Sequence, residues 1–139
     1  MLEHLGLVSA LTELTTTFSR VSGIRVERQF DQSLPKLEPD AELAVYRIAQ
    51  ESLTNVARHS QATRVTVTLE QGFDSVVLRV VDDGRGFVRN PEEHGGLHSM
   101  RERALLIGAA LAIKEASPNG VEVRLEVPAI RVAHPVGVS

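Results

Sequence analysis

The sequence predicts an α+β fold, a two-layer α/β sandwich in which helices cover one face of a mixed, mostly antiparallel sheet. Two observations predict it. Apolar residues recur every three or four positions in residues 2–21 and 40–60, which is typical of helices with one buried face. Later segments alternate apolar and polar residues and follow one another as hairpins, which is typical of half-buried strands.

Composition narrows the class of protein. The chain has 139 residues, enough for one domain with a hydrophobic core. Its net charge of −3 argues against direct nucleic-acid binding, which requires a basic face, and the absence of cysteine excludes disulfides and cysteine-based zinc sites. No apolar run approaches the ~18 residues that span a bilayer, and no signal peptide is recognised. We therefore expect a soluble, cytoplasmic domain, within a full-length protein that can be membrane-anchored.

The first half of the chain is expected to form two helices around one strand. A helix is predicted over residues 2–21, and Gly23 follows it as a C-cap. Residues 24–30 alternate as a strand at the sheet edge, and two prolines mark residues 31–39 as a loop. The second helix is predicted from Glu38 or Asp40 to about Ser60. The apolar stripe of the first helix consists of Leu7, Leu11, Leu14, Phe18 and Val21.

The second half is expected to be mostly strands. Ser99 and Glu102 are three residues apart, as in a capping box, which places the start of a third helix at Ser99. The remaining predicted elements are strands over residues 65–69, 75–82, 110–116 and 121–127, a loop over residues 87–98 and a tail over residues 129–139.

An acidic, glycine-rich loop, Asp82-Asp83-Gly84-Arg85-Gly86-Phe87, follows the strand of residues 75–82. A carboxylate at the end of a buried strand needs a hydrogen-bond donor, and glycine allows close approach of a ligand. The loop therefore predicts a pocket for a flat ligand that offers an N–H group. An Asp-Gly turn between two strands explains the same residues.

A polar cluster lies on the second predicted helix. Glu51, Asn55 and His59 are spaced by four residues, with Arg58 beside them, so an α-helix would place them on one line next to the core stripe. A carboxylate, an amide and two potential cations at a core boundary suggest a binding site. A solvated helix face with i,i+4 hydrogen bonds is the alternative.

Taken together, these stretches resemble the nucleotide-binding boxes of the GHKL ATPase superfamily, in the family's order over about residues 22–128. The run Gly-Leu-x-x-Met-Arg-Glu-Arg that begins at Gly96 is similar to the form in NarX/DesK-type sensor histidine kinases. The matching stretches are residues 50–59 for the N box, 82–87 and 95–104 for the first two glycine boxes, and 119–121 for the third.

The resemblance implies a division of the chain. Residues 1–21 resemble part of the second helix of the family's dimerisation and phosphoacceptor hairpin, residues 22–128 the ATP-binding catalytic domain of the Bergerat fold, and residues 129–139 a tail. The phosphoacceptor histidine is not expected in this chain, because His4 is followed by Leu5 and not by an acid. The implied partners are that hairpin, a response regulator with a DNA-binding output domain, and a second copy of the full-length kinase.

The resemblance also implies ATP and Mg²⁺ as ligands. Asp82 would accept a hydrogen bond from adenine, and Asn55 would offer its amide oxygen to Mg²⁺. Glu51 would act on the nucleophile or hold magnesium through water, and the acid beside the phosphoacceptor histidine is a rival base. The other implied nucleotide contacts are Arg58, His59, Gly84, Gly86 and Met100, together with Gly95, Gly96 and Leu97 as a lid over the phosphates.

The sequence departs from the family pattern at His94, where a glycine is common, and at Val121, where a threonine is common. The first departure bears on the lid geometry, and the second removes a hydroxyl that could contact phosphate or backbone. Within the superfamily, an anti-sigma serine kinase or a gyrase/MutL-like ATPase is a second hypothesis, and a nucleotide-binding scaffold without transfer activity is a third.

Overall fold

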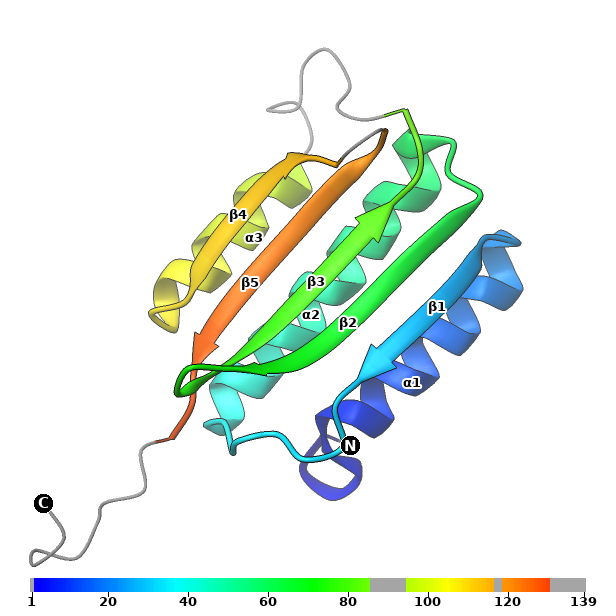
Figure 1. Ribbon diagram of the computed structural model, residues 1–139. Coiled ribbons are helices and arrows are strands. Elements are labelled where there is room, and N and C mark those ends of the chain that lie inside the picture. The colour runs from blue at the N-terminus through cyan, green and yellow to red at the C-terminus, as the bar shows by residue number, and fades with distance from the viewer. Residues whose placement is uncertain (1, 86–94, 117–118, 131–139) are drawn as a thin grey trace, which may run out of the picture.

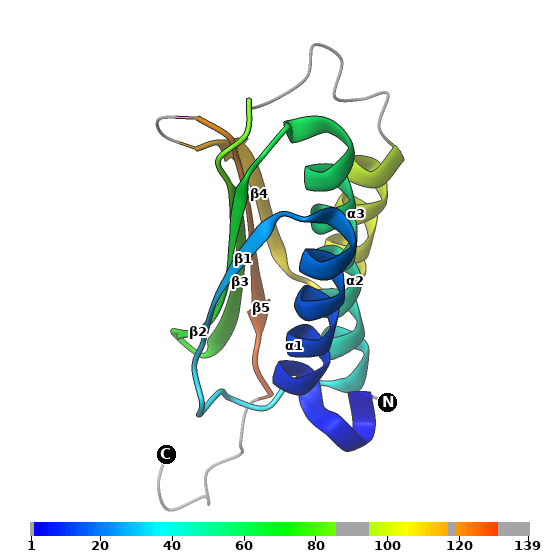
Figure 2. The ribbon, with the colours of Figure 1, turned by 90° about the vertical axis from the view of Figure 1, so that its right-hand side faces the viewer.

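The computed structural model describes residues 2–85, 95–116 and 119–130. In this part of the chain, three α-helices lie side by side on one face of a five-stranded sheet (Figures 1 and 2). The predicted α+β sandwich is therefore confirmed. No helix among these residues is both long and apolar enough to cross a bilayer.

The helices begin and end largely where the sequence places their signals. They are α1 (Leu2–Ser22), α2 (Pro39–Asn55) and α3 (Gly95–Leu106), and a π-helical turn, η1 (Val56–Ser60), continues α2. Gly23 follows α1 with a φ of 77°, a left-handed conformation that suits the predicted C-cap. Pro39 opens α2, where its missing N–H costs no helical hydrogen bond. Within α1, the backbone departs from helical geometry at Gly6.

The sheet is mixed and mostly antiparallel, as predicted. Its order is β1-β2-β3-β5-β4, and only the pairing of β1 with β2 is parallel among the described strands. The strand β1 lies at the edge, as its sequence indicated. The bounds are β1 (Arg25–Phe30), β2 (Arg64–Gly72), β3 (Ser75–Asp82), β4 (Ala110–Glu115) and β5 (Val121–Pro128).

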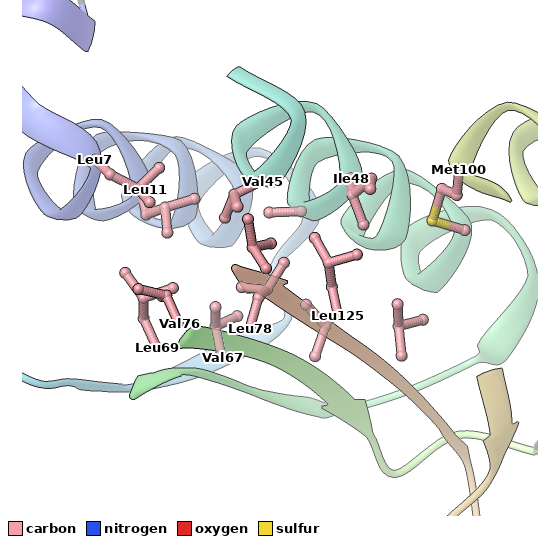
Figure 3. Packing of buried hydrophobic residues seen from close by; sticks show 14 of the residues in the cluster. Leu7, Leu11, Val45, Ile48, Val67, Leu69, Val76, Leu78, Met100 and Leu125 are labelled. Atoms are coloured by element: carbon pink, nitrogen blue, oxygen red, sulfur yellow. The ribbon is translucent and has the colours of Figure 1, made fainter. Parts of the chain in front are cut away.

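The hydrophobic core fills the space between the two layers and includes α1. Leu11 is completely buried, and α1 packs against both α2 and β1 (Figure 3). The first helix is thus built into the sandwich, and its descent from a dimerisation hairpin stays a prediction. The other core side chains labelled in Figure 3 are Leu7, Val45, Ile48, Val67, Leu69, Val76, Leu78, Met100 and Leu125.

Two predicted helix boundaries are wrong. The third helix begins at Gly95, a full turn before Ser99, so Ser99 lies inside it and does not form a capping box. The second helix is not α-helical as far as Ser60, because its last five residues adopt the wider π-helical form of η1.

We expect Leu11→Ala to lower the free energy of unfolding by about 2–5 kcal/mol, since it leaves a cavity between α1 and the sheet. Urea denaturation followed by circular dichroism measures this loss. Val21→Ala is a matched control on the same helix, because Val21 is 78% exposed and should change stability by less than about 0.5 kcal/mol. Equal, small effects of both changes would show that α1 is not part of the cooperative unit.

Candidate nucleotide site

Several chain segments converge at one end of the sandwich. The strand β3 and the helix α2 end there, and β2, β5 and α3 begin there (Figure 1). This topology brings Asp82 at the end of β3, Asn55 at the end of α2 and Gly95 at the start of α3 to the same end of the molecule. These segments are the ones that the sequence singled out.

Asp82 is a buried acid, with only 5% of its surface exposed. Burial raises the pKa of its carboxyl group, backbone N–H groups of Gly84 and Val121 partly offset this rise, and the charge of Asp83 adds to it. The N–H of Gly84 lies 2.8 Å from Oδ1. An ionised carboxylate has about four acceptor positions. Two backbone donors therefore leave capacity for an N–H group of a bound ligand.

Gly120 lies in the stretch that resembles the third glycine box, but it was not among the predicted nucleotide contacts. It has a φ of 103°, and a Cβ atom there would overlap the backbone oxygen of Asp82. Only glycine lets β5 begin this close to the end of β3, which brings the N–H of Val121 to the buried carboxylate. The sequence signals for this position are the match of residues 119–121 to the third glycine box and the Asn-Gly pair, which marks a turn.

Asp83, the next residue in sequence, is exposed, and its pKa is lowered where that of Asp82 is raised. The backbone N–H of Arg64 and the N–H and hydroxyl of Thr63 donate to its carboxylate, and these bonds lower its pKa despite some desolvation. Asp83 therefore has its acceptor positions directed at the protein.

The polar cluster predicted on the second helix lies where α2 continues into η1. Glu51 and Asn55 are half-buried and lie one helical turn apart. Neither side chain makes a hydrogen bond or an ion pair within the described part of the chain, so both are available to a ligand. The predicted continuation of this line to His59 stays a prediction, and the backbone of His59 belongs to the π-helical turn η1. Arg58 lies in η1 and is exposed, and the side chain of His59 lies outside the described residues.

The predicted lid residues form the first turn of α3. Gly95, Gly96 and Leu97 are helical, so their backbone N–H groups are among the first four of the helix, which have no partner within it. Such groups attract anions. Gly86 and His94 lie outside the described residues.

Met100 is a core residue in this structure. Its side chain is completely buried, and the hydroxyl of Ser52 on α2 donates to its sulfur at 3.5 Å. Its expected direct contact with nucleotide stays a prediction, and in this structure its side chain joins α3 to α2. A lone methionine at helical spacing could not distinguish these two roles in the sequence.

No group of three or more histidine, cysteine, aspartate or glutamate side chains that could hold a metal ion occurs among the described residues. The amide oxygen of Asn55 fits Mg²⁺, a hard ion that takes oxygen ligands and is commonly held by few protein groups together with phosphate oxygens and water.

The sequence matches a known family and named relatives. Residues 40–131 match the family described as histidine kinase-, DNA gyrase B-, and HSP90-like ATPase. The sensor histidine kinase LiaS of Bacillus subtilis is 36% identical over 129 residues, covering 91% of this chain and 35% of the relative. The oxygen sensor histidine kinase NreB of Staphylococcus carnosus is 33% identical over 130 residues, covering 91% of this chain and 38% of the relative.

Solved structures share the fold at low sequence identity. The histidine kinase domain of the Erythrobacter litoralis EL346 blue-light activated histidine kinase superposes with a TM-score of 0.73 at 20% identity, covering 88% of this chain and 60% of that one. The Acinetobacter baumannii histidine kinase AdeS gives a TM-score of 0.71 at 11% identity, covering 90% and 64%.

This chain spans little more than a third of the length of LiaS and NreB. The family match nevertheless covers most of the chain, including Asn55, Asp82 and Gly120. The chain therefore belongs to the histidine kinase-, DNA gyrase B- and HSP90-like ATPase family, and it is homologous to the catalytic domains of sensor histidine kinases.

Proposed function

We propose that this chain is the ATP-binding catalytic domain of a two-component sensor histidine kinase. It binds Mg-ATP and donates the γ-phosphoryl group to a histidine on a dimerisation domain outside the chain. The observation that carries the proposal is the buried carboxylate of Asp82, which keeps acceptor capacity at the end of the sandwich where α2 and α3 supply polar groups. The named kinases among the relatives support it.

Asp82 selects adenine in this proposal. An ionised carboxylate only accepts hydrogen bonds, so it pairs with the exocyclic amine of adenine and rejects the carbonyl that guanine has at that position. Gly84 and Gly86 have no Cβ atom, which allows the nucleotide to approach the backbone.

The triphosphate is assigned to the ends of the two helices. The amide oxygen of Asn55 would hold Mg²⁺ together with phosphate oxygens, and the metal supplies charge neutralisation. Arg58 and His59 would attract the phosphates, and the first-turn N–H groups of Gly95, Gly96 and Leu97 would donate to them. Met100 would act indirectly, by holding α3 against α2.

The transfer itself is an in-line displacement. A nitrogen of the acceptor histidine forms a bond to the γ-phosphorus while the bond to the bridging oxygen of ADP breaks. Glu51 would orient the histidine or take its proton, unless the acid beside that histidine does so and Glu51 holds magnesium through water. Positioning and charge neutralisation supply most of the rate enhancement.

The wider assembly follows from this role. Residues 22–128 would be the catalytic domain, residues 1–21 would continue the dimerisation hairpin, and residues 129–139 would be a tail. A homodimeric full-length kinase would pass the phosphoryl group to a response regulator with a DNA-binding output domain.

A transfer assay separates this function from its alternatives. The purified chain is titrated with ATP with and without Mg²⁺, and transfer of labelled phosphate to an added phosphoacceptor hairpin is then measured. We expect Mg-ATP binding and labelling of histidine. Binding without transfer to any hairpin would favour a scaffold, and labelling of a serine on a protein partner would favour an anti-sigma kinase.

We expect Asp82→Asn to weaken ATP binding by at least about tenfold, because it replaces a charged acceptor by an amide. Isothermal titration calorimetry measures the affinity. Asp74→Asn makes the same chemical change at the exposed β2–β3 turn, where asparagine also tolerates the observed φ of 51°, and should leave binding unchanged. Unchanged affinity in Asp82→Asn would refute the adenine assignment.

We expect Asn55→Ala to reduce, by about tenfold, the gain in ATP affinity that Mg²⁺ produces, while binding without metal changes little. Titrations with Mg²⁺ and with a chelator give this gain. Gln50→Ala removes an amide from the same helix, where Gln50 contacts Arg47, and is the control. Equal losses with and without metal would count against Asn55 as a ligand.

A further inference from the structure

Asp83 makes a compact set of hydrogen bonds to the chain that precedes β2. Its Oδ1 accepts from the N–H of Thr63 at 2.9 Å and of Arg64 at 3.0 Å, and its Oδ2 accepts from the hydroxyl of Thr63 at 2.8 Å. Its own N–H donates to the backbone oxygen of Arg64 at 3.2 Å. Through these four hydrogen bonds, Asp83 joins the end of β3 to Thr63 and Arg64 at the start of β2.

These bonds fix the far end of the segment that follows Asn55. That segment contains η1 and then Gln61, which has a φ of 56°, a left-handed conformation that is unfavourable for a residue with a Cβ atom. The carbonyl of Thr63 also accepts from the N–H of Arg25 at the start of β1. An irregular helical turn and a left-handed residue hold their shape only when the surrounding structure determines it.

We propose that Asp83 is a positioning residue for the nucleotide site. Its hydrogen bonds to Thr63 and Arg64 hold the segment after Asn55 against the end of β3, where Asp82 lies. The proposal rests on the proposed function. Asp82 and Asp83 are adjacent, so one end of β3 would define both the adenine contact and the placement of the helix end that holds the metal ligand. Asp83 itself would not contact the nucleotide, because both of its carboxylate oxygens already bind Thr63 or Arg64.

The contact between Asp82 and adenine should not depend on the hydrogen bonds of Asp83. Asp82 is held separately, by its pairing with Val65, by the N–H of Gly84 and by the close approach of Gly120. Loss of Asp83 should therefore affect the metal-dependent part of ATP binding more than the metal-free part. A general loss of stability would affect neither selectively.

The test compares Asp83→Ala with Asp31→Ala. Asp31 is also exposed and accepts a backbone N–H, that of Gln71 at 2.9 Å, but it lies at the opposite end of β2. We expect Asp83→Ala to reduce the Mg²⁺-dependent gain in ATP affinity by about tenfold and Asp31→Ala to leave it within about twofold. Asp83→Asn keeps one oxygen that can accept from the backbone and should restore part of the gain.

A double variant shows whether Asp83 acts through Asn55. If it does, Asn55→Ala with Asp83→Ala should lose no more of the metal-dependent gain than Asn55→Ala alone, because the two changes remove the same contribution. Amide hydrogen exchange without nucleotide gives an independent readout. Exchange over residues 56–62 should accelerate in Asp83→Ala and not in Asp31→Ala.

The outcomes separate this proposal from the proposed function. If the unmodified protein does not bind ATP, the proposed function is wrong. The hydrogen-exchange experiment would still test whether Asp83 holds the segment after Asn55 in place. A full metal-dependent gain in Asp83→Ala, or additive losses in the double variant, would overturn the positioning role. If Asp83→Ala does not fold, Thr63→Val keeps the side-chain shape, removes only the hydroxyl contact, and should reduce the gain about threefold.

Discussion

The carboxylate of Asp82 is held almost entirely out of water at the end of β3, where backbone N–H groups of Gly84 and Val121 donate to it. Burying a charge is costly unless donors surround it, so this end of the sheet is built around supplying them. The loop after β3 turns back to offer one donor, and the start of β5 offers the other. Gly120 permits that approach because it has no Cβ atom.

Two adjacent aspartates thus have different roles because their surroundings differ. Burial raises the pKa of Asp82, and the donors of Arg64 and Thr63 lower that of Asp83. The first carboxylate keeps acceptor capacity for a ligand. The second uses its oxygens to join the start of β2 to the end of β3. In the proposed function, recognition of the nucleotide and support of its site are thus assigned to two neighbouring residues at the end of β3.

The helical layer connects the core to the same end of the molecule. Val45 and Ile48 on α2 lie in the core, and Asn55 lies at the point where the helix leaves it and becomes η1. Met100 and Ser52 join α3 to α2 through a buried contact. Packing between the helices and the sheet therefore positions the polar ends of α2 and α3. A change that loosens the core would also move these ends.

The sequence by itself determined the class of fold, nearly every strand, the edge position of β1 and the main polar candidates at Asn55 and Asp82. The fold class and the strands follow from the spacing of apolar residues, because local periodicity records which face of an element is buried. The polar candidates follow from the acidic glycine-rich loop, the polar cluster on the second helix and the resemblance to the GHKL superfamily. The tertiary structure decided the parallel pairing of β1 with β2, the π-helical turn, the burial of Met100, and the contacts of Gly120 and Asp83. Each of these depends on residues distant in the chain, and the position of such partners in space is not encoded in any local pattern.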